Sequence, residues 1–306
     1  METKRRQGFR WALQQKGSVV PAVFKQVLLC GLFGFFISSV HNLRNLGFSL
    51  SVPLWAGVIP TIVIALLLVI RTQTAYERFS EGRKNWGNLT NTVRNQARQV
   101  WVAVREIEPA DRTKKLETIR LLVAFVVATK LHLRGEPVNS ELEYLLSNER
   151  CLELRNITNP PLQISFWIGN YFQEQYSRKS INSTQLAAMH KLLDRMVNNL
   201  GACERVIKTP VPLAYALHLR ELVLIYCLTL PFQMVGAFFW LTAPIVALIS
   251  FALLGLEELN REMENPFGYD DNDLPLDLNC DIMLHNIEDL ISQELSPGNW
   301  QLTSVN

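Results

Sequence analysis

The sequence has few of the residues that build catalytic, metal-binding or nucleic-acid-binding sites. It contains five cysteines and five histidines in 306 residues, and no two cysteines form a CxxC pair. An odd number of scattered cysteines argues against a disulfide framework or a zinc site, so we expect reduced thiols. There is no glycine-rich phosphate loop and no GxSxG motif. Without a catalytic constellation, we expect no enzyme and no required cofactor. With a net charge of +2 and no basic patch among aromatics, we expect no nucleic-acid partner.

Long apolar runs, by contrast, are abundant and unevenly distributed. They occupy Val27–Val40, Val52–Ile70 and Pro210–Leu256, whereas charged residues fill Arg71–Arg120 and both ends of the chain. This distribution is typical of an integral membrane protein. We predict one membrane region and one helical cytosolic region, built together as a single unit over residues 1–306.

The apolar runs predict four transmembrane helices, each of about 20 residues. Lysine and arginine are frequent before the first span and after Arg71, which places both of these regions in the cytoplasm. No lysine or arginine occurs from Glu221 to Leu259, so we expect the last two spans to be joined on the outside by a short turn after Pro231. The predicted spans are approximately residues 24–42, 52–70, 214–231 and 232–256, with cytosolic helices at approximately 71–210 and 257–306.

The charged regions predict a bundle of amphipathic helices. Apolar residues recur at helical spacing in residues 85–132, with a break at Pro109, and in residues 161–178, 183–201 and 277–295. The segment VAFVVATKL is apolar enough to resemble a span, but Arg120 and Lys130 enclose only nine residues. We therefore predict a buried helix of the cytosolic bundle there.

The stretch Val58–Gly87 predicts one long helix that leaves the membrane at Arg71. In its apolar half, Ile62, Leu66 and Ile70 are four residues apart and lie within about 80° of one another. In an ordinary membrane helix such a stripe faces lipid or packs against neighbours. In a symmetric oligomer it would surround the axis as a hydrophobic constriction, which controls ions by dewetting.

Two charged motifs are each open to two interpretations. Arg71 and Arg78 form either a solvated face with short-range ion pairs or a field below the constriction that attracts ions of one sign. The run Asn265–Asp273 places several acids, among them Asp270 and Asp273, in a loop. Oxygen-rich loops bind calcium, but the spacing here is not that of an EF-hand. The run is therefore either a solvated loop with helix-capping acids or a divalent-ion site.

Three segments resemble the signatures of the bestrophin family, in its prokaryotic and plant branch. They are RTQTAYERFSEGRKNWG at residues 71–87, CERVIKTPVPLAY at residues 203–215 and ENPFGYDDNDLPLD at residues 264–277. Gln73 replaces the asparagine that is usual in the family. The three segments occur in the expected order, and the resemblance extends from Phe9 to about Leu295.

The resemblance implies an all-α polytopic membrane protein that forms a homopentameric ion channel. Each subunit would contribute four transmembrane helices and a helical cytosolic region around one central pore. By this resemblance Ile62, Leu66 and Ile70 form the narrow hydrophobic neck. A second, cytosolic constriction would lie within Gly201–Glu204, and Ala202 is its candidate residue.

The resemblance also implies which ions could regulate the channel and which could pass through it. In the animal members an acidic clasp binds Ca2+ and opens the neck, and Asn265, Asp270 and Asp273 stand at matching positions. Most members of the family pass chloride and related anions, while a bacterial member prefers cations. Arg71 and Arg78 favour anions if they face the pore axis. We therefore expect a passive channel for chloride.

Two other functions remain alternatives: a monovalent cation channel of the same fold, and a non-conducting membrane scaffold. A carrier would need inverted repeats or polar groups at the membrane midplane, and the spans show neither clearly. The expected partners are further copies of the chain, membrane lipid and permeant anions. We expect the protein in a prokaryotic plasma membrane or a photosynthetic internal membrane, with both termini in the cytoplasm.

Overall fold

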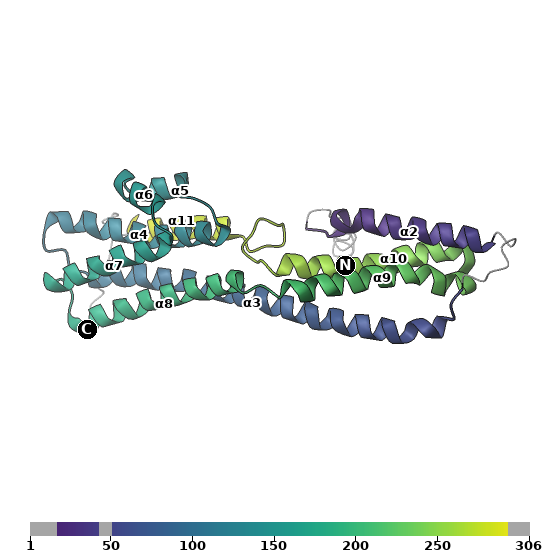
Figure 1. Ribbon diagram of the computed structural model, residues 1–306. Coiled ribbons are helices and arrows are strands. Elements are labelled where there is room, and N and C mark those ends of the chain that lie inside the picture. The colour runs from purple at the N-terminus through teal and green to yellow at the C-terminus, as the bar shows by residue number, and fades with distance from the viewer. Residues whose placement is uncertain (1–16, 43–50, 293–306) are drawn as a thin grey trace, which may run out of the picture. The chain divides into compact units, whose positions relative to one another are not determined.

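The computed structural model describes residues 17–42 and 51–292, and these residues form helices joined by turns and loops without any strand (Figure 1). The prediction of an all-α fold is therefore confirmed for this part of the chain. The elements are α2 (Val20–Asn42), η2 (Leu54–Gly57), α3 (Val58–Ala103), α4 (Pro109–Arg134), α5 (Ser140–Leu145), α6 (Asn148–Arg155), α7 (Pro160–Ser177), α8 (Ser183–Lys208), α9 (Leu213–Phe238), η3 (Phe239–Leu241), α10 (Thr242–Met263) and α11 (Leu276–Ser292).

The chain divides into two compact units. The first contains the described residues up to Ser80 together with Thr209–Asp273, and the second contains Glu81–Lys208 with the described residues from Leu274 onward. Two of the apolar stretches long enough to cross a bilayer lie in the first unit, and another begins there. These stretches are Val20–His41, Val58–Ala103 and Leu213–Met263. The first unit is therefore the part of the chain suited to a membrane.

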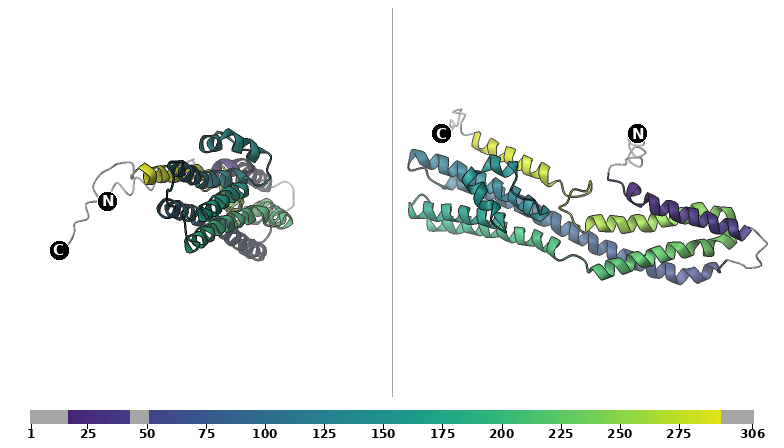
Figure 2. Two further views of the ribbon diagram at one scale, coloured as in Figure 1. Left: turned by 90° about the vertical axis from the view of Figure 1, so that its left-hand side faces the viewer. Right: turned by 45° about the horizontal axis from the view of Figure 1, so that its top comes forward.

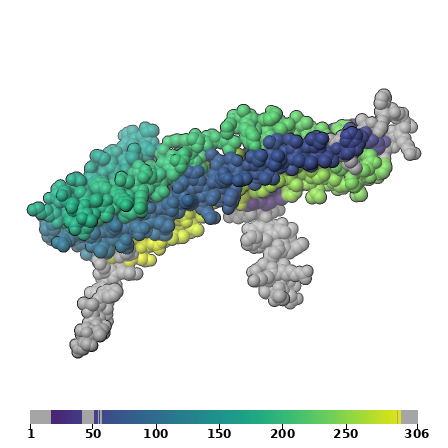
Figure 3. Space-filling view, turned by 90° about the horizontal axis from the view of Figure 1, so that it is seen from below, coloured from purple at the N-terminus to yellow at the C-terminus, as the bar shows by residue number. Residues whose placement is uncertain are grey.

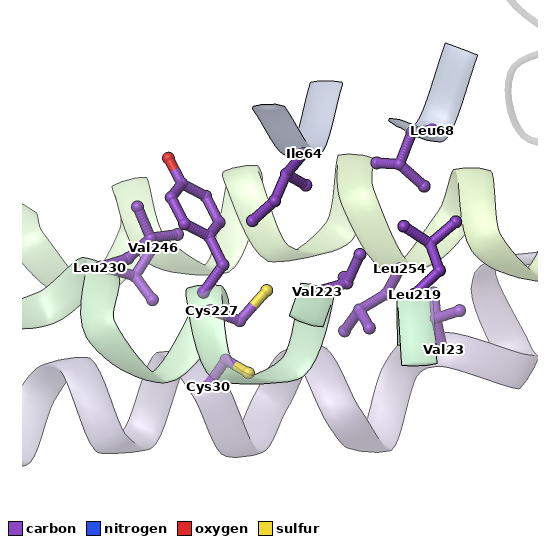
Figure 4. Packing of buried hydrophobic residues seen from close by; sticks show 11 residues of the cluster. Val23, Cys30, Ile64, Leu68, Leu219, Val223, Cys227, Leu230, Val246 and Leu254 are labelled. Atoms are coloured by element: carbon purple, nitrogen blue, oxygen red, sulfur yellow. The ribbon is translucent and has the colours of Figure 1, made fainter. Parts of the chain in front are cut away.

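In the first unit, α2 packs closely against α10 through small residues, and α9 lies beside both (Figure 1). A Cβ atom at Gly31 would lie 3.3 Å from Cβ of Ala247, and one at Gly34 would lie 3.4 Å from Cα of Ala243. The two glycines thus allow the close backbone approach that is common between membrane helices. Buried apolar side chains from α2, α3, α9 and α10 fill the space between the helices (Figure 4).

The turn between α9 and α10 differs from the prediction. It lies at η3 (Phe239–Leu241), whereas the sequence suggested a turn after Pro231. Pro231 is buried inside α9. A proline removes one backbone donor, but packing against neighbouring helices lets a membrane helix continue through it. The residues at the true turn are as apolar as the helices on either side, so the sequence did not mark it.

The helix α3 extends beyond its predicted end. It contains 46 residues and continues past Gly87 to Ala103. It thereby contributes residues to both units. Glycine weakens a helix by about 1 kcal/mol relative to alanine, an amount that packing of the flanking residues outweighs. Trp86 and Leu89 on either side of Gly87 are buried and provide that packing.

The second unit is organised around α4, against which α7, α8 and α11 lie (Figures 1 and 2). Every residue of α4 from Leu121 to Leu131 is buried, which confirms the prediction of a buried helix rather than a span. Pro109 occupies the first turn of α4, where its missing N–H costs nothing, and Glu108 and Asp111 form a capping box. The backbone of Glu108 and the guanidinium of Arg178 lower the pKa of Asp111 to about 2.

A buried lysine of α4 forms ion pairs with α5 and α11. Lys130 is 1% exposed, and its Nζ lies 2.6 Å from Oε2 of Glu141 in α5 and 2.7 Å from Oδ1 of Asp277 in α11. Burial opposes the charge of Lys130, but the two carboxylates outweigh it and raise the pKa of the amine. The predicted helix at residues 277–295 corresponds to α11, and its last three residues lie outside the described part.

Candidate ion pathway along helix α3

One face of α3 in the first unit carries exposed apolar side chains. Ile62 and Leu66 are 61% and 60% exposed, and Ile70 is 49% exposed. With about 100° of rotation per residue, the three side chains span about 80° of the helix surface. Figure 3 shows the N-terminal half of α3, in dark blue, uncovered at the surface. The three predicted neck residues therefore share one uncovered face.

The opposite face of α3 attaches the helix to its unit. Ile64 and Leu68 are buried in the cluster of Figure 4. Arg71 and Ala75 continue the same face, with exposures of 3% and 1%. At about 100° per residue, the centre of this buried face lies about 170° from Leu66. The helix thus has one packed side and one free side.

Beyond Ile70 the uncovered face becomes polar. Gln73 and Glu77 are exposed, and helical rotation places both within the angular range of the three apolar residues. The amide Nε2 of Gln73 donates a hydrogen bond of 3.1 Å to Oε1 of Glu77. Glu77 is the first charged residue on this face after Ile70. The sequence analysis missed it, although its spacing of seven residues from Ile70 was the signal.

Arg71, for which the sequence left open ion pairs or a field below the constriction, lies on the packed face and forms ion pairs. Its Nη2 is 3.3 Å from Oε1 of Glu264 and 3.7 Å from Oε1 of Glu257. Its Nη1 donates a hydrogen bond of 3.2 Å to the backbone carbonyl of Ala216 in α9. The guanidinium therefore binds three groups of its own unit. It does not point toward the face of Ile70.

Arg78, two turns further along, occupies the same packed face. Its guanidinium donates to the backbone carbonyl of Thr209, and Nη2 donates to the carbonyl of Glu264 over 3.4 Å. The expectation that Arg71 and Arg78 create a field below the neck required them to face the axis. In this fold their side chains are turned toward α9, α10 and the segments next to these helices. We call Arg71 and Arg78, with Glu257 and Glu264, the arginine clamp.

The acidic half of the clamp comes from one face of α10 and its end. Glu257, Asn260 and Glu264 are three and four residues apart, so they share a face of the helix. Asn260 is fully buried, and its amide has no hydrogen-bond partner among the described residues. The sequence analysis missed Glu257 and Asn260. The signal was an acid and an amide at helical spacing behind an apolar run.

The loop after α10 contains the proposed divalent-ion residues. Oδ2 of Asp273 accepts a hydrogen bond of 2.8 Å from the backbone N–H of Asp270, and Oδ1 of Asn265 accepts one of 3.4 Å from Phe267. A Cβ at Gly268 would lie 2.7 Å from Oδ2 of Asp273 and 3.3 Å from Nδ2 of Asn265. Asn265 and Asp273 thus come together beside Gly268, while the side chain of Asp270 is exposed. Over the described ranges, no group of three or more histidine, cysteine or acidic residues could hold a metal ion.

The same loop is tied to the start of α2. The backbone N–H of Gly17 donates a hydrogen bond of 3.0 Å to Oδ2 of Asp271. Nδ2 of Asn272 donates to the carbonyl of Gly17 over 3.1 Å and to Oε2 of Glu262 over 2.8 Å. The polar groups of the loop therefore hold segments far apart in the sequence together.

Ala202, the candidate for the cytosolic constriction, lies in α8 and is half-buried. It belongs to the second unit, whereas the neck residues belong to the first. Glu204 next to it has Oε1 2.9 Å from Nε2 of His132 and Oε2 2.8 Å from Nζ of Lys208, and Asn159 donates a further bond of 3.0 Å. Burial raises the pKa of Glu204, but Lys208 and His132 outweigh it and lower the pKa. The constriction at Ala202 stays a prediction.

The comparison with protein families identifies the class of protein. Residues 1–289 match the sequence model of a family described as Bacterial/Fungal Bestrophin protein. The chain therefore belongs to the bestrophin family, as its three signature segments suggested. This membership and the apolar helices make it an integral membrane protein.

Individual relatives cover nearly the whole chain. The voltage-dependent anion channel-forming protein alr2987 of Nostoc sp. is 52% identical over 298 residues, which is 97% of this chain and 95% of that protein. The voltage-dependent anion channel-forming protein sll1024 of Synechocystis sp. is 50% identical over 91% of this chain and 90% of its own length. The crystal structure of a bacterial bestrophin homolog from Klebsiella pneumoniae is 30% identical, with a TM-score of 0.81 over 88% of this chain and 98% of that chain.

The acidic loop yields a test of its role. We expect Asp273→Ala to weaken the loop by about 1–2 kcal/mol, because the carboxylate that caps the N–H of Asp270 is lost. Asp270→Ala is the matched control and should have little effect, because its own carboxylate is exposed. Limited proteolysis of the loop, with calcium and with a chelator, measures both variants. If calcium protects the natural loop and Asp270→Ala abolishes that protection, the loop is a metal site and its role is not only structural.

Proposed function

We propose that this protein is a homo-oligomeric channel that passes monovalent anions, chloride first among them, passively down their gradient. The uncovered apolar face of Ile62, Leu66 and Ile70 carries the proposal. Membership of the bestrophin family and relatives named as anion channel-forming proteins support it. The same observations favour a channel over an enzyme.

A ring of identical chains gives the free face of α3 a role. In a single chain, lipid would suit Ile62 and Leu66, and Gln73 and Glu77 on the same face would lie in the water beyond Arg71. A closed ring with this face turned to the axis brings both parts onto a water-filled path. We propose five copies, the number that the family resemblance implies.

The proposed topology has four spans. These are α2, the apolar start of α3, α9 and α10, with η3 on the outside. The lysines and arginines before α2 and after Arg71 favour a cytoplasmic position for the second unit and for both termini. The proposed location is a prokaryotic plasma membrane or a photosynthetic internal membrane.

The neck would act as a hydrophobic gate. Where apolar side chains line a narrow path, water leaves it readily, and an ion that passes loses hydration without compensation. Ile62, Leu66 and Ile70 would form such a path over two turns of α3. Ala202 is proposed as part of a second constriction in the second unit.

The proposal that the permeant ion is an anion depends on the names of the relatives and not on the neck residues. Apolar side chains at Ile62, Leu66 and Ile70 carry no charge that distinguishes anions from cations. Glu77 favours the alternative of a cation channel with the same fold, because it is the nearest charge on the free face. In the remaining alternative, a non-conducting scaffold, the apolar part of that face would contact lipid or a neighbouring helix.

We also propose that the channel needs no cofactor. Calcium takes six to eight oxygen ligands. In the loop after α10, the side chains of Asn265, Asp271 and Asp273 accept hydrogen bonds from backbone N–H groups. These bonds support a structural role for the loop.

The direct test of function is the current carried by purified protein in planar bilayers under a KCl gradient. We expect current that reverses near the chloride equilibrium potential. Reversal near the potassium potential would retain the channel and select the cation alternative. A sealed membrane in bilayers that contain correctly assembled protein would select the scaffold.

The neck is tested by shortening its side chains. We expect Leu66→Ala combined with Ile70→Ala to raise single-channel conductance roughly twofold or more, because a wider path stays wet. Leu248→Ala is the control, since Leu248 is an apolar residue of α10 with 69% exposure. Equal conductance in the two variants would show that the stripe of α3 does not line the pore.

Glu77 is tested by removing its charge with little change in shape. In the KCl gradient, Glu77→Gln should move the reversal potential toward the chloride value, and the shift should be larger at low salt. Glu221→Gln makes the same change at an exposed position of α9 and should leave the reversal potential unchanged. A shift of the same size in both variants would mean that Glu77 has no special position on the ion path.

A further inference from the structure

We propose that Arg71 and Arg78 are positioning residues that fix the rotation of α3 and thereby the shape of the neck. This inference rests on the proposed channel function. Arg71 follows Ile70 directly in the sequence, yet the two side chains lie on different sides of the helix. Whatever holds Arg71 in place also determines the direction in which Ile70 points.

Other contacts of α3 also bear on that rotation. The hydroxyl oxygens of Thr61 in α3 and Tyr226 in α9 lie 2.5 Å apart, and in the second unit α3 buries Trp86 and Leu89. Among the described residues, the backbone of α3 does not approach α2, α9 or α10 as closely as these three approach one another. Ile64 and Leu68 attach α3 to the apolar cluster. Apolar contacts are non-directional, so they hold the helix against its neighbours without defining its angle sharply.

The arginine clamp adds a directional restraint directly after Ile70, the last residue of the neck. The guanidinium of Arg71 binds the carbonyl of Ala216 in α9, Glu257 in α10 and Glu264 directly after α10. A guanidinium offers donors in a fixed plane, so several acceptors together define its orientation. If α3 rotated, this charge would lose its partners while still buried, which is strongly unfavourable.

Arg78 repeats the restraint two turns further along. It binds the carbonyls of Thr209 and Glu264 from the same face of α3 as Arg71. Glu264 therefore contacts both arginines, through its side chain and through its backbone. These two restraints, seven residues apart, oppose rotation of α3 about its own axis.

Small rotations matter at the neck. The side chains of a helix end about 5 Å from its axis, so a rotation of about 20° moves them by about 2 Å. A displacement of this size in every copy changes the width of a ring of apolar side chains. Dewetting depends steeply on that width. The clamp would thus control conduction without touching an ion.

The test compares single-channel records of Arg71→Gln, Glu264→Gln and the double variant with the natural protein. We expect each single variant to replace one main conductance level by several, spread at least threefold, because α3 is no longer held at one angle. The double variant should match the single ones, since all three remove the same contact. Arg71→Lys should restore the main level only in part, because an ammonium lacks the planar fork.

Arg83→Gln is the matched control, because it removes an exposed cation of α3 outside the packed face. It should retain a single main level. If Arg71→Gln does not assemble, Arg78→Gln and Glu264→Gln provide the comparison. Assembled clamp variants with the natural conductance level, or effects that add in the double variant, would overturn the positioning role alone. A natural protein that does not conduct would overturn the proposed function and this inference together.

Discussion

The burial of the Arg71 charge is the constraint on which the first unit depends. A guanidinium at the end of an apolar stretch cannot be removed from water without acceptors around it. The acceptors come from distant parts of the chain: a carbonyl of α9, an acid near the end of α10 and another just after it. Because Arg71 of α3 needs these acceptors, α9 and the end of α10 lie beside it. The apolar packing of α2, α3, α9 and α10 can then be less specific.

The two faces of α3 follow from the same constraint. Once Arg71 and Arg78 are directed toward α9 and α10, helical periodicity places Ile62 and Leu66 about 120–180° away from them and Ile70 about 80–100° away. In the proposed oligomer, this apolar stripe would face the axis. The stripe and the clamp are therefore two results of one rotation, although only the stripe would lie beside an ion.

Sequence periodicity revealed much of this arrangement and missed its most informative part. It grouped Ile62, Leu66 and Ile70 on one face and identified VAFVVATKL as buried, because spacing and the length of apolar runs are local properties. It could not show where Arg71 points, since its partner Glu264 is 193 residues away. The turn at Phe239–Leu241 was missed for a related reason. There the chain reverses by packing, without a local signal.

These contacts change how the charges after the second span should be interpreted. Arginines next to an apolar neck suggest anion selectivity when the sequence is considered alone. Here the clamp directs Arg71 and Arg78 away from the face of Ile70, and the first charge on that face is the carboxylate of Glu77. The carboxylates of Glu257 and Glu264 compensate the charge of Arg71, so this arginine contributes little net field at a distance. If this face of α3 lines a pore, the selectivity of the pore between anions and cations depends on which charges remain on that face. The number of basic residues near the membrane does not determine it.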